Sequence, residues 1–326
     1  MSNQAVAQTR ARAKLSVNAT QNLIITGIFI LICAALSLIV PKFLTLRNIR
    51  YLFIQVAYVV ISCSATTLVI LSGNLDLSIG GLAAMGGVVY ALLARAGVAT
   101  FAAAALAVLI SGTFIGFVNG TFVSRFKMPS FIVTIATMYI ARGIAYIGAG
   151  GAVITADLPG DFQKIGLFSI GPINAPLFYS ILVFLIFLFI QNKTVFAKQT
   201  YAIGSNLVTA TLSGINVNRV VTILFVLSGT LAAFNGVFQT SSFGIADCKI
   251  FKGLEFDVII ACVLGGTDIN GGRGTIFGTL IGALIIGVLS NAMNLMGLAI
   301  YHQDVVRGIV LVGAILLHRL ISNRIR

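Results

Sequence analysis

The stretch AKQTYAIGSNLVTATLSGINVNR (residues 197–219) decides how this chain is organised, because it is polar and stands between two apolar blocks. The block ILVFLIFLFI (residues 181–190) precedes it, and VVTILFVL (residues 220–227) follows it. A segment so rich in hydrogen-bonding groups cannot rest in hydrocarbon, so we expect it in water or against another protein. The basic residues Lys198 and Arg219 at its edges favour the cytoplasmic side of a membrane.

The composition is that of a membrane protein. Of the 326 residues, 58% are hydrophobic and 9% are charged, and the mean hydropathy is +1.05. A soluble domain has about 25% charged residues, so this chain has too few charges to cover a water-soluble surface. Its apolar blocks are continuous and do not alternate as barrel strands do, which indicates helices. Since one helix needs roughly 20 apolar residues to cross a bilayer, we predict an all-α polytopic membrane protein with about 10 transmembrane helices, in a range of about 8–10.

The expected organisation is one membrane domain. Residues 1–22 form a basic cytoplasmic tail, residues 23–321 form a single transmembrane permease domain, and residues 192–219 form a cytoplasmic loop within it. With about ten spans, both termini lie in the cytoplasm. Lys42 and Arg47 fit this topology poorly, because they would lie outside. The expected spans are residues 23–40, 51–71, 82–93, 101–123, 131–148, 177–191, 220–240, 253–265, 275–295 and 303–320.

The charge balance also narrows the choice of partners. The net charge is +13, and the basic residues bracket apolar blocks, which indicates membrane topology and anionic lipid headgroups, with no nucleic acid as a partner.

A polar stretch separates the second expected span from the third. The stretch LSGNLDLSIGG (residues 71–81) has apolar residues on both sides, and interrupted helices mark binding sites in many transporters. A carboxylate at mid-membrane costs roughly 2.5–3.5 kcal/mol, so we expect Asp76 either to line a path or to cap the following helix. A similar stretch, LGGTDINGG, recurs at residues 264–272.

Several amide side chains fall within the expected spans. They either join helices by hydrogen bonds or line a path for an uncharged solute rich in hydroxyl groups. No cluster of carboxylates suits a cation. The candidate substrate-path residues are Asn74, Asp76, Ser78, Asn119, Asn235, Gln239, Asn291 and Asn294.

The sequence offers no catalytic or metal-binding motif. The glycine-rich stretch GTDINGGR (residues 266–273) lacks the Lys-Ser/Thr that a phosphate-binding loop requires, so we expect no ATP bound by this chain. The two histidines, His302 and His318, and four scattered cysteines provide no metal-ligand spacing. We therefore expect no catalytic residue, no metal and no cofactor in this chain.

Five motifs resemble the permease subunits of bacterial sugar ABC importers of the ribose, xylose and galactose type. They are LSGNLDLSIG (residues 71–80), KMPSFIVT (127–134), YAIGSN (201–206), LSGINV (212–217) and LGGTDINGGRGT (264–275). The resemblance implies a non-catalytic transport subunit in the bacterial inner membrane, which moves a pentose, a hexose or a related polyol. It also implies a cytoplasmic ATPase that uses ATP and Mg²⁺, a periplasmic sugar-binding protein, and a second permease copy, identical or paralogous.

In that family the polar segment between spans couples the permease to its ATPase. The matching residues here are Gly204, Asn206, Leu212, Ser213, Gly214 and Ile215. The chain departs from the family at residues 207–209 and at Thr211, where acidic residues, alanine and arginine are usual. An apolar contact therefore replaces a charged one in this interpretation.

Other solutes and another mechanism stay open at this point. Within the same fold the solute is alternatively a furanose-type autoinducer or a branched-chain amino acid. A different class, an ion-coupled secondary transporter, needs a buried titratable relay, for which Asp76 is the main candidate.

Overall fold

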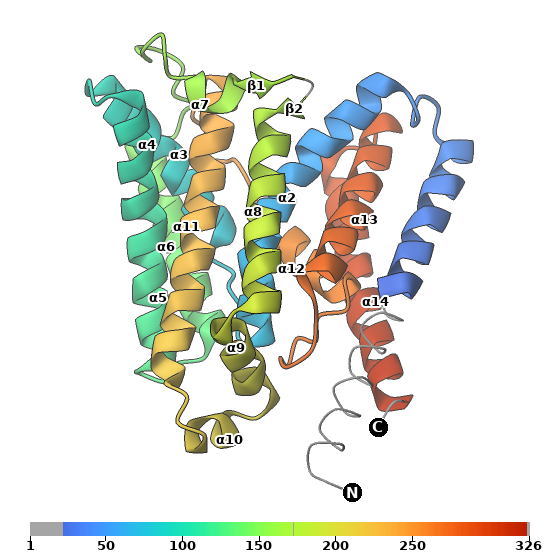
Figure 1. Ribbon diagram of the computed structural model, residues 1–326. Helices are drawn as coiled ribbons and strands as arrows, with labels where there is room; N and C mark the ends of the chain where they lie inside the picture. Colours follow the sequence, from blue (N-terminus) through green and yellow to red (C-terminus); the bar gives the residue numbers. More distant parts are fainter. Residues whose placement is uncertain (1–21, 172, 325–326) are drawn as a thin grey trace, which may run out of the picture.

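The computed structural model describes residues 22–171 and 173–324, which form a bundle of helices running between two ends (Figure 1). The first described helix is Asn22–Ile39. The elements that follow are α2 (Leu46–Leu71), α3 (Ile79–Arg95), α4 (Thr100–Val108), the π-helical turn η1 (Leu109–Phe114), α5 (Ile115–Ser124), α6 (Ser130–Gly148), α7 (Lys164–Leu167), β1 (Ser169–Ile170), β2 (Ile173–Asn174), α8 (Ala175–Lys193), α9 (Val195–Ser205), α10 (Leu207–Leu212), α11 (Val217–Phe243), α12 (Leu254–Leu264), α13 (Ile276–Leu295) and α14 (Ile300–Arg324).

The predicted fold class, a helical polytopic membrane protein, is confirmed. Each of the ten expected spans falls on a helix of the described residues. Within that part of the chain, 7 helices are long and apolar enough to cross a membrane, and α3, with 17 residues, is apolar but shorter. The number of about ten crossings stays a prediction. The basic tail at residues 1–22 lies almost entirely outside the described residues.

The core is built around α11, which packs closely on α3 and on the continuous helix α4–η1–α5. Glycines allow this approach: a Cβ added to Gly120 would lie 2.6 Å from Thr222 Cα, and one added to Gly86 would lie 2.7 Å from Ala233 O. Gly112 and Gly116 face the α11 backbone in the same way. The four-residue spacing of Gly112, Gly116 and Gly120 places them on one helix face, as the sequence predicts.

The two ends of the bundle differ. In Figure 1, α9 and α10 project from one end, whereas α7, β1, β2 and the turn before α2 lie at the other. The strands β1 and β2 pair antiparallel, with Ser169 opposite Asn174. Lys42 therefore lies at the end away from α9 and α10, which is where a ten-span topology puts it.

Two elements of the bundle are interrupted. The chain leaves the helical conformation after Leu71 and resumes it at Ile79, and Gly73 there has a φ of +80°. Helix α12 has 11 residues, and irregular backbone stands on both sides of it. The break around Asp76 is thus where the sequence predicts it. Non-helical backbone inside a membrane bundle must be satisfied by protein or water, so both interruptions mark places to search for function.

Candidate functional site

The polar segment between α8 and α11 folds into two short helices, where the sequence predicts a loop. Capping explains the result: Asn206 ends α9 and begins α10, and its Oδ1 accepts a hydrogen bond from Thr209 N at 2.9 Å. Thr194 Oγ1 caps α9 in the same manner. Gly214, with a φ of +78°, lets the chain turn sharply after α10.

Helix α10 presents apolar side chains to the outside. Leu207, Val208 and Leu212 are 52%, 68% and 84% exposed, while Ala210 faces inward and is buried. Ser213 is also exposed, and its hydroxyl donates to Thr209 O within the same turn. A group of exposed apolar side chains at one end of the bundle, beside polar residues, is typical of a contact surface. We call Leu207, Val208 and Leu212 the α10 apolar face.

Next to α10 along the chain, α9 packs against both glycine-rich stretches, residues 71–81 and 264–274. Gly204 packs on Leu71 O, and a Cβ added to Gly204 would lie 2.6 Å from Gly272 N. Gly272 N donates to Leu71 O at 2.9 Å. A Cβ on Gly271 would lie 2.7 Å from Gly73 N and 3.0 Å from Gly204 Cα. These five residues form a glycine junction, in which three backbones meet without side chains between them.

Tyr201 adds a polar link to the same junction. Its Oη donates to Gly274 O at 2.6 Å and accepts from Gln191 Nε2 at 2.6 Å. Gln191 Oε1 in turn accepts from Ile276 N at 2.8 Å, at the start of α13. Burial raises the pKa of Tyr201 above 10.0, against the opposing effect of the Gln191 hydrogen bond, so the phenol keeps the proton that it donates.

A buried polar cluster follows directly after the junction along the chain. Asp76 Oδ1 accepts from Ser78 N at 2.9 Å and from Ser78 Oγ, and Asn119 Nδ2 donates to Ser78 Oγ at 3.2 Å. Ser228 of α11 lies beside the Asp76 carboxylate. Asp76, Ser78 and Asn119 are at most 1% exposed. Asp76 Oδ2 and Asn119 Oδ1 have no hydrogen-bond partner among the described residues, so the cluster retains unused acceptors.

The other candidate path residues do not join this cluster. Asn235 Nδ2 donates to Tyr58 O and Ser62 Oγ, both at 2.8 Å, so Asn235 ties α11 to α2. Gln239 lies one turn further along α11, where its Oε1 is buried without a partner in the described structure. Asn74 donates to Ser72 next to the break.

The two amides of α13 are also held by partners. Asn291 exchanges hydrogen bonds of 2.9 Å with Asn48 of α2, and Asn294 Oδ1 accepts from Gln303 Nε2 at 2.8 Å. Their assignment to a substrate path stays a prediction.

The reciprocal pair of Asn48 and Asn291 gives a testable result. Replacing Asn291 by leucine leaves the buried Asn48 Oδ1 without its donor, while Asn48 Nδ2 keeps its hydrogen bond to Phe43 O at 2.8 Å, so we expect the purified chain to lose about 1–3 kcal/mol of stability. Replacing both asparagines by leucine should recover part of that loss, since no amide is then orphaned and only Phe43 O loses a donor. Thermal unfolding in detergent measures both variants. Equal destabilisation by the single and double replacements would contradict a pairwise role.

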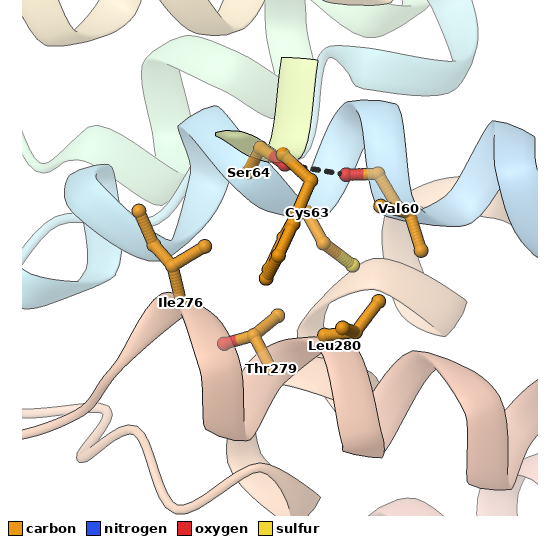
Figure 2. A pocket seen from close by; sticks show the side chains of 7 residues that line it. Val60, Cys63, Ser64, Ile276, Thr279 and Leu280 are labelled. Atoms are coloured by element: carbon orange, nitrogen blue, oxygen red, sulfur yellow. Dashed lines mark hydrogen bonds between the residues drawn. The ribbon is translucent and has the colours of Figure 1, made fainter. Parts of the chain in front are cut away.

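A small pocket lies apart from these groups, between α2, α8 and α13 (Figure 2). Its lining is Val60, Cys63, Ser64, Phe184, Ile276, Thr279 and Leu280. The Ser64 hydroxyl donates to Val60 O at 2.8 Å within its own helix. The side chains that line the pocket leave no space large enough for a water molecule. This pocket therefore does not hold a sugar-sized solute.

Sequence reasoning missed several residues of the site. Ser228 belongs to the Asp76 cluster, Leu71 and Gly272 belong to the glycine junction, and Gln191 and Tyr201 form the polar link beside it. The similarity between residues 71–81 and 264–272 was the available signal, because the structure brings the beginning of one into contact with the end of the other. Tyr201 stands within YAIGSN, but nothing in that motif indicates its partner at Gly274.

Residues 48–315 match the family model described as "Branched-chain amino acid transport system / permease component". No solved structure matches the chain.

Three characterised relatives align along most of the chain. The L-arabinose ABC transporter permease protein of Azospirillum brasilense is 37% identical over 93% of this chain and 88% of its own length. The ribose import permease protein of Bacillus subtilis is 40% identical over 90% of this chain and 91% of its own. The D-allose transport system permease protein of Escherichia coli is 34% identical, with 88% of each chain covered.

Proposed function

The chain belongs to the "Branched-chain amino acid transport system / permease component" family, and from this premise we propose that it is the membrane-spanning subunit of an importer for a monosaccharide. The proposal rests mainly on the similarity of this chain to proteins that are named as permeases for monosaccharides. Those cited are named for L-arabinose, ribose and D-allose, and each aligns over at least 88% of this chain. A pentose or a hexose is thus favoured over a furanose-type autoinducer or a branched-chain amino acid.

The protein is a transport subunit that crosses the bacterial inner membrane several times. As the permease of an ABC importer, it works with an ATPase and a periplasmic binding protein. In our proposal, ATP and Mg²⁺ are used by the ATPase and this chain holds neither. Both termini lie in the cytoplasm with α9 and α10, and a second permease copy, identical or paralogous, completes the membrane part.

We place the ATPase contact on the α10 apolar face. Leu207 and Val208 belong to the positions, residues 207–209 and Thr211, at which the family usually has acidic residues, alanine and arginine, while Leu212 matches the family. Because all three side chains of this face are apolar and exposed, the contact relies on apolar burial. Movement of α9 reaches the Asp76 segment through the glycine junction, because Gly204 touches Leu71 and Gly272 directly. The cluster of Asp76, Ser78 and Asn119 offers unused acceptors that suit the hydroxyl groups of a passing sugar.

A reconstituted importer tests this function. The chain, its ATPase and its binding protein are placed in proteoliposomes, and uptake of L-arabinose, ribose, D-allose and leucine is measured with ATP. We expect uptake of at least one monosaccharide to exceed that of leucine by more than about tenfold, a free-energy difference above ~1.4 kcal/mol. Uptake should persist when an ionophore collapses the proton and sodium gradients.

Two outcomes contradict the proposal. Uptake of leucine alone would favour the amino-acid alternative, and loss of all uptake on adding the ionophore, with ATP still present, would favour an ion-coupled carrier.

A further inference from the structure

The segment between α11 and α12 turns back into the bundle. Helix α11 ends at Phe243, and α12 begins only at Leu254, lower in the bundle than the upper end of α11 in Figure 1. The Phe251 ring lies 5.5 Å from the ring of Tyr58, which stands in the interior of α2. A Cβ added to Gly80 would lie 2.6 Å from Phe251 O, and Gly80 is about 22 Å along α3 from its last residue, at 1.5 Å per residue. Irregular backbone thus reaches the depth at which α3 begins.

Residues 247–253, which we call the re-entrant loop, bring carbonyl groups to this depth outside a helix. Backbone N–H groups satisfy some of them: Ile250 N donates to Asp247 O at 3.2 Å, and Leu254 N donates to Phe251 O at 3.1 Å. Arg142 of α6 supplies further donors. Its Nη1 donates to Cys248 O at 3.1 Å and to Ile250 O at 3.0 Å, and its Nη2 donates to Phe251 O at 3.5 Å. Because such backbone persists in a membrane protein only where protein or water satisfies it, the Arg142 side chain, which bonds Cys248 O and Ile250 O, ties this loop to α6.

The position in which Arg142 holds the loop leaves one buried carboxylate oxygen of the described chain without a hydrogen bond. Glu255 is 5% exposed, and its Oε2 has no hydrogen-bond partner within the described residues. Both that oxygen and Arg142 Nη2 face Gly80, the latter 3.1 Å from where a Cβ would be. Phe251 has a φ of +53°, in a region that side chains disfavour. Backbone strain clusters at active sites, ligand clamps and switch regions, and a buried polar atom without a partner calls for an explanation.

We propose that the re-entrant loop is a movable plug on the side of the Asp76 cluster away from α9, that Arg142 positions it closed, and that it withdraws in each transport cycle. Its place supports this role: Gly80, which touches Phe251, stands two residues after Ser78 of the cluster. A solute moving between the cluster and that end of the bundle meets this loop. The inference rests on the proposed function only in taking the chain as a solute permease, whatever the solute.

Cys248 provides a built-in reporter, because it is in the loop and is 0% exposed. The permease–ATPase complex is placed in lipid nanodiscs, with Cys33, Cys63 and Cys262 replaced by alanine, and treated with a water-soluble maleimide. We expect slow labelling of Cys248 at rest. Labelling should become at least about tenfold faster when ATP, Mg²⁺ and loaded binding protein are added, which corresponds to exposure of the thiol during turnover.

The arginine variants separate positioning from mere folding. Arg142→Gln should label rapidly without ATP, whereas Arg142→Lys, which keeps a charge and three donors, should fall between it and the unchanged residue. Arg95→Gln is the matched control: Arg95 pairs at 3.2 Å with Asp157 at an exposed position, and its loss should leave labelling slow. A loop that stays protected in Arg142→Gln would overturn the proposal.

A cross-link provides a second, independent test. In a chain with all four cysteines replaced by alanine, Tyr58→Cys and Phe251→Cys are joined by copper phenanthroline and oxygen, which take two electrons and two protons from the thiol pair. Uptake should fall below about a tenth and return when a reductant breaks the disulfide. Normal uptake by the cross-linked protein would show a static loop. Absence of uptake by the unaltered chain would contradict the proposed function instead, while the resting labels still report on Arg142.

Discussion

Replacing Leu212 by glutamate is expected to abolish stable association with the ATPase. Leu212 is 84% exposed at the tip of α10, and burial of such a side chain in an interface contributes about 1.5–3 kcal/mol. Removing that burial and placing a carboxylate in an apolar contact should weaken binding by at least about 10- to 100-fold. Co-purification of the tagged permease with the ATPase measures the loss, and Val208→Glu should act in the same direction.

The control is a leucine at the other end of the bundle. Leu167 in α7 is 61% exposed, and Leu167→Glu introduces the same chemical change away from α10. It should leave ATPase binding unchanged. If Leu212→Glu also bound the ATPase normally, the α10 apolar face would not be the contact.

The second large effect is expected at the glycine junction. Gly204→Ala places a methyl group against Leu71 O and 2.6 Å from Gly272 N, both backbone atoms that cannot move aside separately. Overpacking of this kind costs about 1–3 kcal/mol. Because Gly204 lies behind the α10 apolar face, we expect the ATPase still to bind, while solute uptake falls at least about tenfold. Paired assays of ATP hydrolysis and uptake on the same preparation reveal the uncoupling.

Gly143→Ala is the matched control for that variant. Gly143 lies within α6, and a Cβ added there meets no atom within 4 Å. Alanine should be tolerated and should even favour the helix by up to about 1 kcal/mol. Uptake at the normal rate by Gly204→Ala would remove the junction from the coupling route.

The sequence predicts the bundle well because long apolar runs leave a chain little choice but to form helices. The break at Asp76 and the close approach at Gly112, Gly116 and Gly120 follow from local pattern alone. The two helices within residues 192–219 do not follow from local pattern, because their apolar periodicity is weak. The residue types that cap them, above all the asparagine at Asn206, are also common in loops.

Contacts between segments that are far apart in the chain cannot be predicted from local sequence pattern. The meeting of Gly204 with Leu71 and Gly272 depends on how three elements pack, and the hold of Arg142 on the re-entrant loop joins residues 106–109 positions apart. An arginine inside an apolar run looks like a boundary residue in the sequence. Only the carbonyl groups around it reveal what it does.

The helix Asn22–Ile39 has a consequence for how such chains diverge. Only 6% of it is buried by the rest of the molecule, and it precedes the matched residues 48–315. A membrane-spanning helix that the rest of its own chain covers so little is constrained mainly by length and hydrophobicity, and Leu, Ile, Val and Phe serve that requirement about equally. Sequence drift among relatives should therefore concentrate there, while Ile25, which packs on Ile281 and Ile285, keeps its size.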